Sequence, residues 1–350
     1  MSEVCMSEIY FSKKVTFFNV ALTLLIVLLH AKTPERWGLE LTMDYPLIYL
    51  VSTLCQISIP LFFFISGLLF YRNCSFSCLR QKLRSRARSL LVPYLLWNII
   101  YVSIYFALTH ISFTHSVMNM GEALNSPREI LVAVINSRFS VLWFIKDLLV
   151  FTVLSPLILV VLRNAWFSAL CLCVLIVLSL TINTGYESLL KWAPIYFQGA
   201  MLGHWGFKDG EYLSFDRIIK TQKVQSMCSV AIILTLTVLF GVTVADESAI
   251  SLFRLSSPIL LWILCDFIFH DFIINKFHVK AWMKYTFFIY CTHKFILDVM
   301  QKICVITLPP SHLVLNMVFI LTPALTIPLI VVVADNIHDS KFYQLLCGGR

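Results

Sequence analysis

Long runs of apolar residues, separated by short polar loops, follow one another along almost the entire chain. A helix needs about 20 apolar residues to cross roughly 30 Å of hydrocarbon, and the runs have this length. They are continuous rather than alternating, which excludes a transmembrane β-barrel. The pattern therefore predicts about ten membrane-spanning helices. These helices are expected near residues 15–31, 47–71, 90–109, 141–162, 165–182, 189–205, 225–244, 250–270, 284–305 and 312–334.

The composition agrees with this pattern. Hydrophobic residues make up 59% of the 350 residues and charged residues only 13%, unlike any soluble globular domain. The chain is thus expected to be an all-α, polytopic membrane protein with one integral membrane domain over residues 1–350. Its eleven cysteines follow neither a zinc-site spacing nor a disulfide framework, and no metal is expected.

The charges in the loops predict how the helices are oriented. Basic loops remain in the cytoplasm, and three even-numbered loops are basic whereas the first and seventh are mixed or acidic. Both termini are therefore expected in the cytoplasm, with an even number of spans. The net charge of +8 is explained by the basic residues of these cytoplasmic loops, so no nucleic-acid partner is expected. The loop after the second span carries Arg72, Arg80, Lys82, Arg84, Arg86 and Arg88.

The first predicted span has a polar residue near each end. Asn19 lies near the cytoplasmic end and His30 at the outer end. Their spacing is about three helical turns, so both side chains share one stripe of the helix, about 17 Å apart. Polar residues inside a membrane usually face a protein interior or a wet cavity. We interpret this helix as one wall of a site that runs through the bilayer.

Candidate ligand contacts also lie near the cytoplasmic end of the second span. Ser66 and Gly67 precede Arg72 there, and a glycine allows either a ligand or another backbone to approach closely. Tight helix packing is therefore the alternative to ligand contact. Arg86 and Arg88 belong to the basic loop, which either anchors the topology or binds phosphate, because arginine can grip phosphate through two hydrogen bonds.

The fourth and ninth spans carry further candidates. Lys146 and Asp147 are adjacent in an apolar run and point about 100° apart, so each is expected to have another partner. Lys146 could also extend to the interface. Trp143 begins the same run, and the ninth span has His293 one turn after Tyr290. These three are candidates for substrate contact, although a histidine between helices can equally be a packing residue.

Several segments together resemble a known family. Besides the run from Asn19 to His30, the segments are LFFFISGLLFYR, RARSLLVPYLLWN, LWFIKDLLVFTVLSPLI, YFQGAMLG and FFIYCTHKFIL. Their order resembles that of the acyltransferase 3 family of bacterial membrane proteins. The resemblance extends from Phe17 to about Val333. It is strongest to the branch that includes fucose O-acetyltransferase-like and exopolysaccharide-modifying O-acyltransferases.

The resemblance implies an activity and its substrates. It implies ten spans with cytoplasmic termini in the inner membrane, acyl-CoA (by default acetyl-CoA) as donor, and a hydroxyl of a cell-surface glycan or its lipid-linked precursor as acceptor. The family has an arginine about three turns before a histidine in the first span. His30 matches the histidine, but Asn19 stands in place of the arginine. Either other arginines hold the donor, or this member has altered or lost activity.

A reaction scheme follows as an expectation. His30 would take the proton of the acceptor hydroxyl as general base, Asp147 would orient its ring, and Lys146 or a backbone dipole would stabilise the oxyanion. The donor would be bound from the cytoplasmic arginines inward. Its expected contacts are Asn19, Ser66, Gly67, Arg72, Arg86 and Arg88.

A second class of function also fits the sequence. Intramembrane histidine, lysine and aspartate occur in transporters and flippases of glycans or small polar solutes, where they relay protons or bind substrate. The lack of visible repeated halves speaks against that class. Consumption of acyl-CoA would separate an acyltransferase from a transporter.

Overall fold

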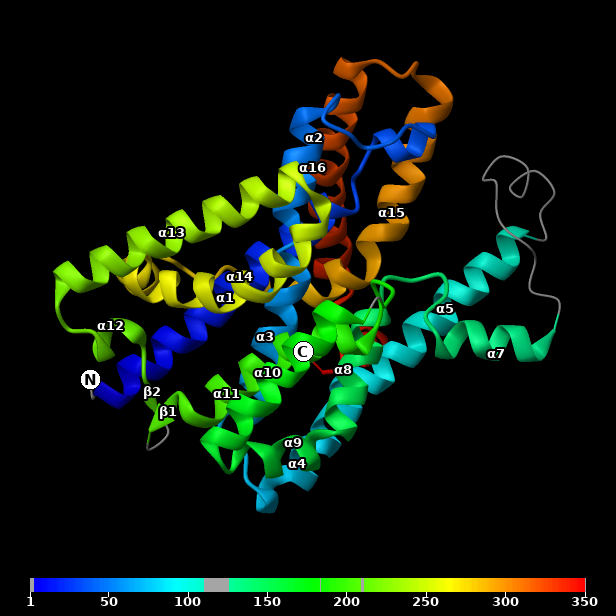
Figure 1. Cartoon of the computed structure of the whole chain (residues 1–350). Coiled ribbons are helices and arrows are strands. Elements are labelled where there is room, and N and C mark those ends of the chain that lie inside the picture. The colour runs from blue at the N-terminus through cyan, green and yellow to red at the C-terminus, as the bar shows by residue number, and fades with distance from the viewer. Residues whose placement is uncertain (1–2, 110–125, 183, 209–210, 350) are drawn as a thin grey trace. The chain divides into compact units, whose positions relative to one another are not determined.

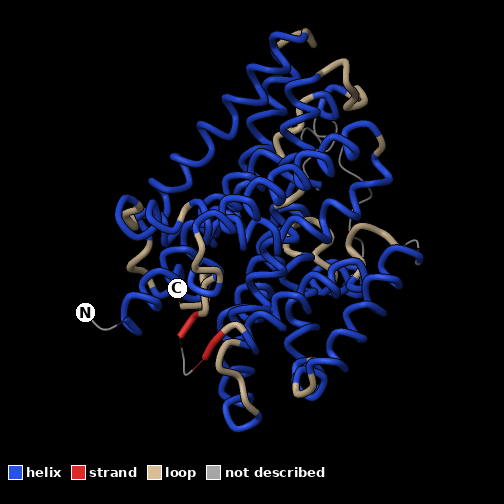
Figure 2. The backbone as a smooth tube through the Cα atoms, turned by 60° about the vertical axis from the view of Figure 1, so that its left-hand side comes forward, coloured by secondary structure: helices blue, strands red, loops and turns tan. Residues whose placement is uncertain are grey.

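The computed structural model describes residues 3–109, 126–182, 184–208 and 211–349. Almost all of these residues are helical, and the strands form one short antiparallel pair, β1 (Phe207–Lys208) and β2 (Glu211–Tyr212) (Figure 2). The predicted all-α class is confirmed. The chain divides into two compact units: 1–29, 42–79 and 155–283 form the first, and 30–41, 80–154 and 284–350 the second.

The first unit is built around the pair α3 and α11. α1, α10 and α14 pack beside this pair, and α13 runs along α14 (Figure 1). A π-helical turn (Phe272–Lys276) contacts α1. The helices are α1 (Glu3–Leu29), α2 (Pro46–Cys55), α3 (Ser58–Tyr71), α9 (Ser155–Leu162), α10 (Ala165–Thr181), α11 (Leu189–Trp205), α12 (Phe215–Ile218), α13 (Gln222–Ala245) and α14 (Ile250–Ile268), with a 3₁₀ turn at Glu247–Ala249.

The second unit contains the remaining helices. α15 packs on α16, while α5 packs on α7 and α17. α4 (Phe76–Arg86) begins in the first unit and ends in the second. The other helices are α5 (Val92–Thr109), α7 (Pro127–Ile135), α8 (Trp143–Val153), α15 (Thr286–Thr307), α16 (His312–Ile337) and α17 (Lys341–Leu346), with a π turn at Ala87–Leu91 and 3₁₀ turns at Pro34–Trp37 and Ala281–Tyr285.

The long apolar helices agree with a polytopic membrane protein. Within the described ranges, six helices are long and apolar enough to span a membrane, or seven if α8 and α9 together form one span. All ten predicted segments contain helix, but α10 and α11 have only 17 residues each. α15 carries Lys294, Asp298 and Lys302, which lower its hydropathy. The number of ten spans and the side of each terminus remain predictions.

Glycines bring the backbones of α3 and α11 into direct contact. A Cβ atom added to Gly67 would overlap the carbonyl oxygen of Tyr196, and one added to Gly199 would overlap that of Phe64. Gly203 meets α3 in the same way one turn later. Small residues allow such close approach between membrane helices. Helix packing therefore accounts for all three glycines.

We predict that Gly199→Ala destabilises the protein, because the methyl group would force the two backbones apart. Overpacking of this kind costs about 1–3 kcal/mol or more. Gly241→Ala in α13 is the matched control, since an added Cβ there has nothing within 4 Å. The control should be neutral or stabilising by about 0.5–1 kcal/mol. Thermal unfolding in detergent measures both, and equal losses would contradict the packing role.

Candidate functional site

Two histidines from distant parts of the chain face each other in the second unit. His30 follows the last residue of α1, and His293 lies in α15. Their ring centroids are 5.2 Å apart and the rings are tilted by 46°. His293 is fully buried, whereas His30 is partly exposed. The sequence identified both residues, and the structure brings them together.

The hydrogen bonds of His293 define its tautomer. Its Nδ1 atom lies 2.8 Å from the carbonyl oxygen of Tyr290 and 3.1 Å from that of Ile289. A carbonyl oxygen can only accept, so Nδ1 carries the hydrogen and Nε2 is an acceptor. Within the described residues Nε2 is buried without a partner, and the ring of His30 makes no hydrogen bond. The pair therefore offers open ring nitrogens, the chemistry that a proton acceptor needs.

The loop that carries His30 is fixed to α15 and α16. Gln301 donates from Nε2 to the carbonyl oxygen of Ala31 over 2.9 Å. Thr33 donates from Oγ1 to the carbonyl oxygen of Leu315, also over 2.9 Å. Because these bonds lie directly after the histidine, they hold its backbone in place.

A cluster of charges adjoins this loop. Asp298 accepts hydrogen bonds from Nζ of Lys294, which lies 2.7 Å from both carboxylate oxygens, and it also pairs with Arg36. Lys294, Lys32 and Arg36 are the positive charges that act on His30. Lys32 in turn pairs with Glu35 over 3.3 Å, so these three cations are accompanied by two carboxylates and the cluster keeps a net positive charge near the ring. Asp298 had no expected partner from the sequence, although its spacing of one turn from Lys294 could have indicated one.

The other predicted residues of the catalytic group lie in α8 and α15. Tyr290 is buried and donates its phenol hydrogen over 2.6 Å to a backbone carbonyl just before α8. Trp143 and Asp147 are buried in α8, and Lys146 is partly exposed. In the described ranges, His30 has no hydrogen bond or ion pair with Asp147 or Lys146. Their roles in orienting the ring and stabilising the oxyanion stay predictions.

Arg72, a predicted donor contact, already has a counter-charge. Its guanidinium pairs with Glu8 in the first unit. The same group lies 4.8 Å from the ring centroid of Phe11 and 4.9 Å from that of Phe207. These contacts are sufficient to explain the partly buried position of the arginine without a ligand.

The other residues that were predicted to contact acyl-CoA are distributed over both units. Arg88 is exposed and Arg86 partly exposed in the second unit, at the junction of α4 and the π turn. Asn19 and Ser66 are partly buried in the first unit, where Gly67 packs against α11. Their part in binding a donor remains a prediction.

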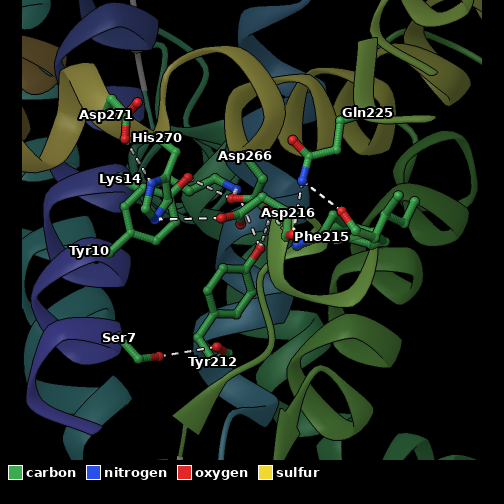
Figure 3. A network of polar contacts seen from close by, with 11 residues as sticks. Ser7, Tyr10, Lys14, Tyr212, Phe215, Asp216, Gln225, Asp266, His270 and Asp271 are labelled. Carbon is green, nitrogen blue, oxygen red and sulfur yellow. Dashed lines mark hydrogen bonds and ion pairs between the residues drawn. The ribbon is translucent and has the colours of Figure 1, made fainter. Parts of the chain in front are cut away.

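A buried ion pair, absent from the sequence predictions, lies in the first unit (Figure 3). Lys14 is fully buried, and its Nζ atom lies 2.6 Å from Oδ1 of Asp266. Lys14 also donates to the carbonyl oxygen of Trp262 over 2.9 Å. Asp266 further accepts from the hydroxyls of Tyr10 (2.6 Å) and Tyr212 (2.8 Å). Lys14 lies directly before the first predicted span, residues 15–31, where a lysine is expected to face water.

The network joins α1, α14 and the strand pair. Burial and then the negative charge of Asp266 raise the pKa of Tyr212 well above its ordinary value, so the phenol stays protonated and donates. The backbone N–H of Phe215 gives Asp266 a fourth donor, 3.1 Å away. These four donors occupy the hydrogen-bonding sites of both carboxylate oxygens. Asp266 therefore has a structural role and has no lone pair left for a substrate.

Comparison with known proteins identifies the family. A family model described as an acyltransferase domain matches residues 20–334, a range that includes most of both units and contains His30 and His293. Asn19 and Lys14 precede the matched range. Searches of curated proteins and of solved structures found no match. Because the family model matches most of the chain, this protein belongs to the acyltransferase 3 family.

Proposed function

We propose that the chain is a membrane O-acyltransferase of the inner membrane. It would move an acyl group, acetyl by default, from acyl-CoA to a hydroxyl of a cell-surface glycan or its lipid-linked precursor. Family membership supports acyl transfer. The observation that carries the proposal is the pair of histidines, with open ring nitrogens at a partly exposed position. Ten spans with both termini in the cytoplasm complete the proposal.

The pair suits general base catalysis. Neutral His30 takes the proton of the acceptor hydroxyl while the hydroxyl oxygen attacks the thioester carbonyl. The tetrahedral intermediate then expels the CoA sulfur, which takes the proton from the imidazolium. Nε2 of His293 can accept the other N–H of His30 and so keep the ring oriented. The cations around His30 would stabilise the oxyanion.

Two arginines of the second unit are candidates for binding the donor phosphates. Arg88 is exposed and Arg86 is partly exposed. Arg72 is also partly exposed and pairs with Glu8. Arginine binds phosphate through paired hydrogen bonds, so Arg86 and Arg88 can provide the charge that Asn19 lacks. In the proposed topology both lie at the cytoplasmic side, where acyl-CoA is available.

Reconstituted protein tests the proposal directly. Liposomes that contain the purified chain should release CoA from labelled acetyl-CoA and transfer the label to added glycan, unlike empty liposomes. The reaction should require donor on the side that carries Arg86 and Arg88. Passage of glycan without consumption of acetyl-CoA would instead identify a transporter and would overturn the proposal.

A further inference from the structure

A small pocket in the first unit contains two positively charged side chains. It lies among α10, α11 and α14, and its lining includes Lys191, Trp192, Ser251 and Arg254. Together with its open mouth it encloses about 240 Å³. None of these residues belongs to the histidine pair or to the predicted donor contacts. The pocket therefore shares no residue with the proposed catalytic site.

Arg254 is a buried charge that lacks a counter-charge. Its exposed fraction is 6%, and its one hydrogen bond within the described residues goes to the neutral Oε1 atom of Gln56, 2.6 Å away. Its Nε atom is buried without a partner, and no described carboxylate forms an ion pair with it. An unpaired charge is costly in a membrane-spanning helix such as α14. The site thus lacks a negative charge that would balance Arg254.

Lys191 adds a second positive charge to the same place. The guanidinium carbon of Arg254 lies 4.9 Å from the ring centroid of Tyr186, and Nζ of Lys191 lies 5.9 Å from that centroid. Lys191 forms no ion pair in the described part of the chain. The aromatic ring attracts both cations but cannot neutralise them, and like charges repel. One anion in the pocket would satisfy both.

We propose that this pocket binds an oxyanion, the phosphate or carboxylate group of a ligand. The Nε–H of Arg254, which is buried and has no partner among the described residues, can donate a charge-assisted hydrogen bond to such a group. The hydroxyl of Ser251 makes no hydrogen bond among the described residues and provides a further donor. In the ten-span topology α11 and α14 both begin at the outer side, so the anion comes from an outer-leaflet lipid headgroup or from outside solution. The site is independent of acyl transfer.

Binding to the full chain in nanodiscs tests the site and distinguishes the two sources. In one arm, phosphatidylcholine nanodiscs are titrated with inorganic phosphate against chloride of equal ionic strength. In the other, phosphatidylglycerol replaces part of the lipid. A ligand that binds only the folded protein raises its melting temperature until the site saturates. We expect a saturable rise in at least one arm, and the responding arm identifies a soluble or a lipid-borne anion.

Variants show whether this pocket causes the rise. Arg254→Gln should abolish it, and Lys191→Gln should weaken the affinity about tenfold or more, as loss of a charge-assisted contact does. Lys223→Gln, at an exposed lysine of α13, is the matched control and should respond like the wild type. If Arg254→Gln does not fold, Arg254→Lys keeps the charge but lacks the Nε–H donor of the guanidinium and should also bind more weakly. The proposal is overturned if neither arm saturates, or if the response persists unchanged in the Lys191 and Arg254 variants.

Discussion

His30→Ala is expected to reduce acetyl transfer by at least about a hundredfold, because general base catalysis contributes about 10²–10⁴ to the rate. The ring is partly exposed and contacts only His293 among the described aromatic side chains, so its removal should leave the packing of the second unit intact. Initial rates of CoA release, measured at saturating acetyl-CoA, would show the loss in kcat.

A surface histidine is the matched control for this experiment. His278 is exposed and its ring interacts with the carbonyl of Lys276, outside the histidine pair. His278→Ala should retain wild-type activity, and both variants should keep the wild-type melting temperature. An active His30→Ala protein would remove the residue from the chemistry and leave family membership as the remaining argument for acyl transfer.

Asp266→Ala is expected to destabilise the protein by about 3–5 kcal/mol, the usual cost of breaking a buried ion pair. The substitution would leave Lys14 charged, fully buried and without its carboxylate, and would remove the acceptor of two tyrosine hydroxyls. Denaturant unfolding in detergent, followed by tryptophan fluorescence, measures the loss.

Two further variants test whether the unpaired charge of Lys14 is responsible for the loss. Lys14→Met combined with Asp266→Leu removes both charges and should recover much of the stability. Asp298→Ala breaks two partly exposed ion pairs, with Arg36 and Lys294, and each should cost no more than about 1 kcal/mol. A loss in Asp266→Ala no greater than that in Asp298→Ala would mean that the buried network contributes little.

Much of the fold follows from local sequence because a membrane span needs only a continuous apolar run. Each predicted segment contains helix for this reason. Helix ends were less predictable. α1 begins at Glu3, well before the apolar run, because Tyr10, Phe11 and Lys14 all find buried partners in the folded unit. Those partners are far away in the sequence, and a hydropathy pattern cannot predict contacts between distant residues.

The candidate site was predicted as separate residues rather than as an arrangement. His30 and His293 each stood out because an ionisable ring is rare inside a membrane. Their contact depends on the packing of the loop after α1 against α15, which no periodicity encodes. Asp298 and Arg36 show the same limit: each charge was visible in the sequence, but their pairing was not.

The buried ion pair of Lys14 also has a consequence for the order of events during synthesis of the chain. Lys14 and Asp266 are 252 positions apart. At about 5–20 residues per second, roughly 10–50 s of translation separates their synthesis. Throughout that interval the ammonium group has no carboxylate and stays at the water interface, because lipid cannot solvate it. The buried ion pair can therefore form only after the ribosome has completed α14.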